Sequence, residues 1–144
     1  MVGNMYTSQI DVILVDHWNT EEIVSLYKSG NWWNEEADVS IIPQLIKNSY
    51  AFAIAVNKRL HKAVGMGRVL SDGISDAYIQ DVVVLHEWRR KGIGKRIIQK
   101  LVTFCLSKRI NWIALISEPH QEEFYLPLGF KEMKHYVPMK YDLM

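Results

Sequence analysis

Apolar and polar residues alternate in the first third of the chain in a way that predicts one strand followed by two helices. Residues 11–15 are apolar after the first position and predict an opening strand. Thr20, followed by two glutamates, predicts the cap of a helix that runs to about residue 28 and ends at Gly30. A second helix is predicted over residues 38–48, because its apolar side chains fall on one stripe.

The middle of the chain is rich in strand-forming residues. We predict strands over residues 50–57, 63–70 and 76–85, with a turn at residues 71–73 between the last two. Strands that follow one another this closely can pair as hairpins. The three are therefore expected to form an antiparallel meander.

Helical periodicity returns in the last third. Residues 92–108 place their apolar side chains on one face and predict a long helix. Residues 112–116 predict a strand, and residues 119–126 predict a short helix that Gly129 ends. The remaining residues to Tyr141 predict one or two terminal strands. Together the elements indicate an α+β fold with a mixed sheet, in a single domain over residues 1–144.

Composition narrows the class of protein. A length of 144 residues with 49% hydrophobic residues is enough for one buried core and leaves no room for a second domain. Lys and Arg number 17 against 16 Asp and Glu, so the net charge of +1 does not favour nucleic acid as a partner.

Several classes of site and location are also disfavoured. The single cysteine, Cys105, excludes an internal disulfide and cysteine-rich zinc sites, and it is compatible with a reducing compartment. The histidines have no metal-ligand spacing, so no metal is expected. No stretch has the roughly 18 apolar residues of a membrane span, and no signal-peptide pattern opens the chain. We therefore expect a cytoplasmic protein that does not bind membranes.

The most informative segment is residues 79–95, an apolar strand followed by Arg89-Arg90-Lys91-Gly92-Ile93-Gly94-Lys95 at the start of the long helix. The first amides of a helix lack partners and attract anions, and glycines let a phosphate approach the backbone. A Walker loop would need glycine in place of Arg89 and Ser or Thr in place of Arg96, and the dinucleotide fingerprint would need glycine in place of Ile97, so the sequence excludes both motifs. One alternative to a phosphate site is that the glycines serve only a tight turn and the basic residues are a solvated helix start. Another is that Arg89-Arg90-Lys91, with Lys95-Arg96, forms a nucleic-acid patch, which the lack of a surrounding basic excess disfavours.

Two segments resemble motifs of the GCN5-related N-acetyltransferase (GNAT) family. Residues 79–94 resemble its acetyl-coenzyme A motif, Arg/Gln-x-x-Gly-x-Gly/Ala after a strand. Residues 124–130, Phe-Tyr-Leu-Pro-Leu-Gly-Phe, are similar to its Phe-Tyr-x-x-x-Gly-Phe segment. The resemblance covers residues 50–141. It implies a mixed, mostly antiparallel central sheet with helices on both faces.

The resemblance also implies a cosubstrate, acetyl-CoA, and the residues that bind it. Backbone amides of residues 89–94 would hold the pyrophosphate, and the strand edge at residues 82–84 would pair with the pantetheine arm. That strand would splay from the strand at 112–116, and an N–H near Val84 would polarise the acetyl carbonyl. The predicted cofactor-binding residues are Val82, Val83, Val84, Arg89, Arg90, Lys91, Gly92, Ile93, Gly94 and Lys95.

Acetyl transfer to an amine requires a neutral amine, a stabilised oxyanion and a proton for the leaving thiolate. Tyr125 is the predicted acid, because a phenol can protonate a thiolate and because it matches the family's proposed acid; it could instead pack as a structural tyrosine. For the base, Tyr78, Gln80 and Val82 are expected on one strand face, where Gln80 could orient a water. Asp81 is expected on the opposite face, with a hydrogen-bonding role.

Other groups could also accept the amine's proton. Glu118 and His120 follow the next strand and are further candidates, and the proton could go to solvent. The acceptor pocket is expected from the first helix, the loop after it and the meander turn. Its predicted residues are Tyr27, Trp32, Trp33, Asp72 and Tyr78.

The favoured function is N-acetylation of a primary amine of a small molecule, by direct attack in a ternary complex. A protein or peptide amino group is the closest variant. A non-catalytic CoA-binding sensor is the alternative from another class, because neither Tyr78 nor Gln80 is acidic. A homodimer is possible.

Overall fold

The computed structural model describes residues 9–143, which form a five-stranded sheet in the order β1-β2-β3-β4-β5. The first four strands pair antiparallel and β5 pairs parallel to β4. The strands are β1 (Ile10–Leu14), β2 (Ala51–Asn57), β3 (Lys62–Leu70), β4 (Asp76–Val84) and β5 (Trp112–Ala114). The predicted meander is confirmed, and so is the mixed, mostly antiparallel sheet.

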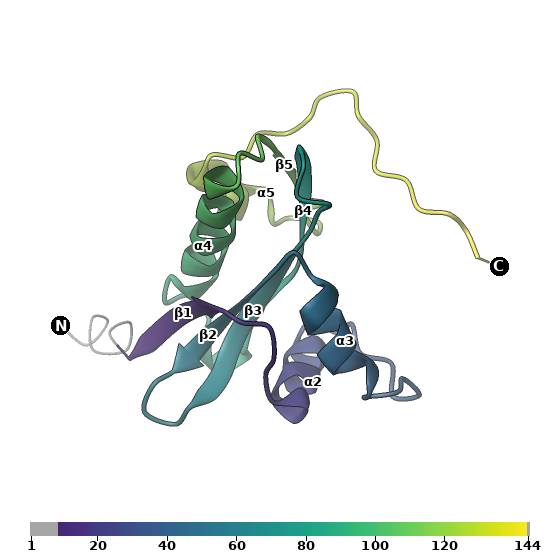
Figure 1. The fold of residues 1–144 in the computed structure, drawn as a ribbon. Helices are drawn as coiled ribbons and strands as arrows, with labels where there is room; N and C mark the ends of the chain where they lie inside the picture. Colours follow the sequence, from purple (N-terminus) through teal and green to yellow (C-terminus); the bar gives the residue numbers. More distant parts are fainter. Residues whose placement is uncertain (1–8, 144) are drawn as a thin grey trace.

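Helices cover both faces of the sheet, as Figure 1 shows. On one face lie α2 (Thr20–Ser29) and α3 (Ile41–Asn48), and on the other lies the long helix α4 (Ile93–Ser107). Short helical segments complete the chain: η1 (His86–Trp88), α5 (Glu122–Tyr125) and η2 (Leu126–Leu128). The predicted α+β class is confirmed.

β2 shows why the two faces are occupied differently. All seven of its residues are buried, with alanines on the α4 face and the larger Phe52, Ile54 and Val56 on the α2/α3 face. Gly65 and Gly67 of β3 also lie under α4, and a Cβ on Gly67 would stand 2.9 Å from Ile97 Cγ2. Small residues therefore let α4 pack closely on the sheet, and larger ones fill the space below the shorter helices.

Several predicted boundaries were wrong. The side chain of Asn19, not Thr20, caps α2 by accepting a hydrogen bond from the amide of Glu22 at 3.0 Å. Asp38 accepts from the amide and hydroxyl of Ser40 in a turn, so α3 begins at Ile41. Aspartate and asparagine compete in this way with helical hydrogen bonds near helix starts.

The end of the chain departs most from prediction. The strand predicted at 112–116 ends at Ala114, and the helix predicted at 119–126 is only the four-residue α5 followed by η2. Residues 131–143 contain no strand. A terminal strand is disfavoured because β5, with three residues, offers few backbone hydrogen-bond partners at its edge. Pro138 also has no N–H to donate to a strand ladder.

Among residues 9–143, no helix combines the length and apolar character required to cross a membrane. Cys105 is buried on α4. Its predicted role as a core residue is confirmed, and burial raises the pKa of its thiol.

Candidate active site

A cleft of about 880 Å³ opens where the second half of β4, the start of α4, the end of α2 and the segment after β5 meet. β5 pairs with β4 only over Asp76–Tyr78, so the same edge of β4 from Ile79 onward has no strand partner among the described residues. The predicted splay between these strands is therefore present. Unpaired backbone groups along this edge are available to an extended ligand.

The start of α4 forms one end of the cleft. Gly92 has a φ of 78°, a conformation that favours glycine, and no atom lies within 4 Å of the position that its Cβ would take. A Cβ on Gly94 would stand 3.2 Å from Phe124 Cζ, so the ring lies close over the helix start. The cleft is also lined here by Arg90 and Lys95. Helix amides, the open position of Gly92 and nearby cations suit a diphosphate group.

Two of the basic residues make side-chain contacts within the protein that the sequence did not predict. Arg89 lines the cleft, but its Nε donates to the carbonyl of Val84 at 2.8 Å and its Nη2 reaches the hydroxyl of Ser29 at 3.3 Å. Its guanidinium therefore ties the end of β4 to α2. Lys91 does not line the cleft, and its Nζ donates to the carbonyl of Glu87 at 3.4 Å. The other predicted cofactor-binding residues line the cleft.

Tyr125 lies in the wall of the cleft between two aromatic rings. It makes edge-to-face contacts with Phe124, at a centroid distance of 4.9 Å, and with Phe130, at 5.8 Å. Burial raises the pKa of Tyr125, and the charge of Glu118 raises that pKa further. The phenol therefore keeps its proton and can donate it. Tyr125 therefore packs between aromatic rings, as a structural tyrosine would, and it also lines the cleft, as a catalytic acid would have to.

A hydrogen bond joins the two sides of the cleft. Trp32 Nε1, in the loop after α2, donates to Glu118 Oε1 at 3.1 Å, and both residues line the cleft. Gly30 makes room for this indole, because a Cβ there would lie 2.7 Å from Trp32 Cε3. Glu118 thus lies near both the predicted acid Tyr125 and the indole of Trp32.

A β-bulge in β4 changes which residues face the α2/α3 side of the sheet. The ladder pairs Met66 with Val83 and Arg68 with Gln80, so Asp81 and Val82 together oppose one residue of β3. Asp81 has a φ of 59°, in the left-handed region. The prediction that Val82 shares a face with Gln80, and that Asp81 faces away, was therefore wrong: Val82 packs on the α4 side.

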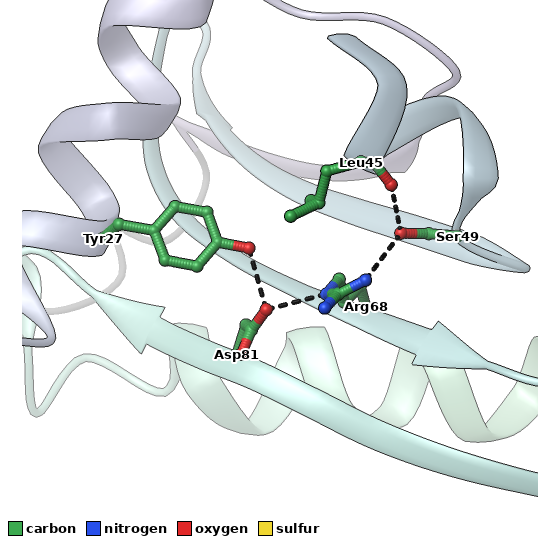
Figure 2. A network of polar contacts seen from close by, with 5 residues as sticks. All are labelled: Tyr27, Leu45, Ser49, Arg68 and Asp81. Atoms are coloured by element: carbon green, nitrogen blue, oxygen red, sulfur yellow. Dashed lines mark hydrogen bonds and ion pairs between the residues drawn. The ribbon is translucent and has the colours of Figure 1, made fainter. Parts of the chain in front are cut away.

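Asp81 instead belongs to a polar network on the α2/α3 side, drawn in Figure 2. Its Oδ2 accepts from the hydroxyl of Tyr27 at 2.8 Å and from Arg68 Nε at 2.7 Å. Arg68 Nη1 reaches Ser49 Oγ at 3.5 Å, and that hydroxyl donates to the carbonyl of Leu45 at 2.7 Å. Burial and the charge of Asp81 raise the pKa of Tyr27, which keeps the phenol a donor.

Sequence reasoning missed Arg68 and underrated Asp81. The aspartate within this apolar strand was a weak signal for a bulge, because aspartate adopts positive φ more readily than most residues, but it does not show how β4 pairs with β3. The residues predicted as catalytic, namely Tyr125, Gln80 and Glu118, all line the cleft.

Four of the predicted pocket residues do not line the cleft, and only Trp32 does. Tyr27 is buried beneath it, and Trp33 packs against Tyr27. Asp72 caps the β3–β4 turn by accepting from the amide of Ile74, and Tyr78 packs on Trp112 outside the cleft. His120 is also outside the cleft lining. Within residues 9–143, no group of three or more acidic, His or Cys side chains could hold a metal ion.

Comparison with known proteins identifies a family of similar sequences and structures. A sequence model of the acetyltransferase (GNAT) domain matches residues 27–140. GCN5-related N-acetyltransferase 1, chloroplastic, of Arabidopsis thaliana is 33% identical over 65% of this chain and 47% of its own length. Histone acetyltransferase TAP1 of Glycine max is 32% identical over 65% of this chain and 44% of its own.

A third relative has a named small-molecule substrate. Serotonin N-acetyltransferase 2, chloroplastic, of Oryza sativa subsp. japonica is 35% identical over 48% of this chain and 34% of its own length. This chain thus spans less than half of each of the three relatives. Among solved structures, an acetyltransferase of Trypanosoma brucei superposes with a TM-score of 0.78 at 20% identity, covering 93% of this chain and 99% of that one. That likeness concerns the fold.

Proposed function

This chain belongs to the acetyltransferase (GNAT) family, and we propose that it transfers an acetyl group from acetyl-CoA to a primary amine of a small molecule. One observation carries the proposal: a diphosphate cradle at the start of α4, an unpaired edge of β4 and a protonated phenol all line one cleft. These features match the three parts of the cosubstrate, namely its pyrophosphate, its pantetheine arm and its thioester.

Each chemical requirement has a residue in the cleft. Amides at the start of α4, with Arg90 and Lys95 beside them, bind the pyrophosphate. The free edge of β4 over residues 82–84 binds the extended arm, and an N–H near Val84 stabilises charge on the acetyl oxygen. Tyr125 donates the proton that the departing thiolate requires.

The amine attacks the thioester directly, with both substrates bound. Gln80 lines the cleft and orients a water that takes the amine's proton toward solvent. Glu118, also in the lining, is the second candidate for this step. No covalent enzyme intermediate is required, because the residues that we assign to the cofactor and those that we assign to the acceptor line one cleft.

The acceptor end of the cleft and one relative support the proposed substrate class. The acceptor end has an indole, Trp32, and two carboxylates, Asp81 and Glu118, which suits a compact amine with an apolar part. The rice relative is named for serotonin, a small amine. The soybean relative is named for histones, so a protein amino group is the second candidate acceptor.

Two further features of the protein are proposals as well. We propose a cytoplasmic location, because a single buried cysteine is compatible with a reducing compartment. We also propose a homodimer, since the apolar side chains of Tyr136, Val137, Met139, Tyr141 and Leu143 are exposed and available to a second copy. Gel filtration with light scattering tests the second proposal.

The central test is release of free thiol from acetyl-CoA in the presence of candidate acceptors. The panel contains arylalkylamines, polyamines, aminosugars, amino acids and lysine peptides, and CoA binding is measured separately by calorimetry. Turnover with one class of small amine supports the proposal, and turnover with peptides alone favours the protein acceptor. CoA binding without turnover on any acceptor favours a sensor, and failure to bind CoA overturns the proposed function.

A further inference from the structure

The carboxylate of Asp81 is held by one oxygen only. Both Tyr27 and Arg68 bond its Oδ2, and within residues 9–143 no hydrogen bond reaches its Oδ1. No buried side-chain nitrogen or oxygen among these residues lacks a partner, so Oδ1 must be accessible. The side chain is 24% exposed and lines the cleft. Asp81 therefore presents an unused acceptor to whatever occupies the cleft.

The local backbone is shaped to present this carboxylate. A positive φ at a residue other than glycine costs free energy and persists where the surroundings hold it. Here Tyr27 from α2 and Arg68 from β3 both bond Asp81, as Figure 2 shows, and the bulge in β4 sets its direction. Without the bulge, strand alternation would turn this side chain to the α4 side. The strain thus serves to place a rigid carboxylate at the acceptor side of the cleft.

Charge along the cleft has two signs. Arg89, Arg90 and Lys95 lie at the end where α4 begins, and Asp81 and Glu118 are the acidic residues of the lining. Glu118 belongs to an exposed segment, and its Oε1 already accepts from Trp32. Asp81 lies directly before residues 82–84, the edge assigned to the pantetheine arm. It is the carboxylate better placed to hold a nucleophile in front of the thioester.

We propose that Asp81 is the residue that binds the acceptor's amino group, with Oδ1 accepting a hydrogen bond from the amine nitrogen. This inference rests on the proposed function and adds a specificity to it: the acceptor is chosen for a cationic amine rather than for a neutral group of the same size. Arg68 and Tyr27 are positioning residues, because they act through Asp81. By bonding Oδ2, they fix the orientation of the carboxylate and keep Oδ1 directed toward the cleft.

The decisive variant is Asp81→Asn. Asparagine tolerates a positive φ, and its oxygen can still accept from Tyr27 and Arg68. Its NH₂ group then takes the place of Oδ1 and confronts the amine with a donor in place of an acceptor. We expect kcat/KM for the best amine to fall about tenfold to a hundredfold, as for loss of a charge-assisted hydrogen bond, with the KM for acetyl-CoA unchanged.

The matched control is Asp72→Asn, which makes the same chemical change outside the cleft. Its side-chain oxygen can still cap the turn by accepting from the amide of Ile74. We expect kcat/KM for the amine to stay within about twofold of the wild type.

A second readout separates binding of the amine from a general loosening of the site. The best amine is compared with the alcohol in which a hydroxyl replaces the amino group, tested as a competitive inhibitor. The wild type should prefer the amine, and Asp81→Asn should lose about tenfold or more of that preference. A purely structural effect would weaken both ligands equally and leave the preference unchanged, which would overturn the inference.

Asp81→Asn leaves the charge of the partly buried Arg68 without a counter-charge, which could prevent folding. The double variant Arg68→Met/Asp81→Asn removes the pair together and keeps the test available if the single variant does not fold. The inference would also be overturned if Glu118→Gln lost the preference for the amine over the alcohol while Asp81→Asn kept that preference. Absence of wild-type turnover on every amine would instead count against the proposed function, so the two failures are distinguishable.

Discussion

The two ends of the cleft are built in different ways. The cofactor end comes from one continuous segment, residues 79–95, in which a strand, a short connection and a helix start follow one another. The acceptor end brings together residues that are distant in the sequence: Tyr27 and Asp81 are 54 positions apart, and Trp32 and Glu118 are 86 apart.

This difference teaches which functions a local pattern can carry. A diphosphate is bound mostly by backbone amides, whose direction is set by the local strand–turn–helix geometry. An amine is bound by side chains, and their position depends on how α2, β4 and the segment after β5 pack together. The four predictions below test the two ends separately, so that a change at one end should leave the other intact.

The largest effect is expected at the cofactor end from Gly94→Glu. A side chain at this position meets Phe124, whose Cζ would be 3.2 Å from the new Cβ, and its charge repels a diphosphate. We expect the Kd for CoA, measured by calorimetry, to rise about a hundredfold or more. Lys100→Gln makes the same change in net charge on an exposed position of α4, and its Kd should match the wild type. Equal loss in both variants would contradict the phosphate cradle.

A second large effect is expected from Tyr125→Phe. Tyr125 lines the cleft between the cofactor end and the acceptor end. Phenylalanine keeps the contacts with Phe124 and Phe130 but cannot donate a proton. We expect kcat to fall about 100-fold or more, with CoA affinity preserved. Tyr78→Phe, on the first half of β4 outside the cleft, should leave kcat unchanged. A kcat for Tyr125→Phe within twofold of the wild type would leave the residue with a packing role only.

A smaller effect is expected at the acceptor end from Trp32→Phe. This change keeps an aromatic wall but removes the donor to Glu118. We expect the KM for the amine to rise about two- to fivefold, with the KM for acetyl-CoA unchanged. Trp33→Phe, one position along and outside the cleft lining, provides the control. A rise in the KM for acetyl-CoA would show that the two ends are not independent.

The smallest effect is expected from Glu118→Gln and concerns pH. Burial is the main cause of the raised pKa of Tyr125, and Glu118 adds to it. An acid must be protonated to act, so kcat falls as pH rises through the pKa of Tyr125. Without the charge of Glu118 that pKa is lower, and the decline should begin at a lower pH than in the wild type. The exposed Glu123→Gln should leave the kcat–pH profile unchanged, and a shift to higher pH in Glu118→Gln would contradict this account.

Much of the fold was predictable because its patterns are local. The three strands of the meander and the long helix α4 were expected within one or two residues of their observed bounds. The end of the chain was not, because a strand requires a partner, and residues 131–143 meet none among the described residues. The apolar residues in that segment predicted strands, but the sequence did not show that β5 has only three residues with which a further strand could pair.

The sequence by itself determined the α+β class and the family, and it located the end of the cleft that we assign to the cofactor, because helix amides and glycines act through local backbone geometry. Tertiary structure alone decided the acceptor end. One bulge reverses the alternation of β4, turns Asp81 toward Tyr27 and Arg68, and moves Val82 to the opposite face. A shift of one residue changes every later side chain on a strand. Only the pairing of β4 with β3 reveals where that shift occurs.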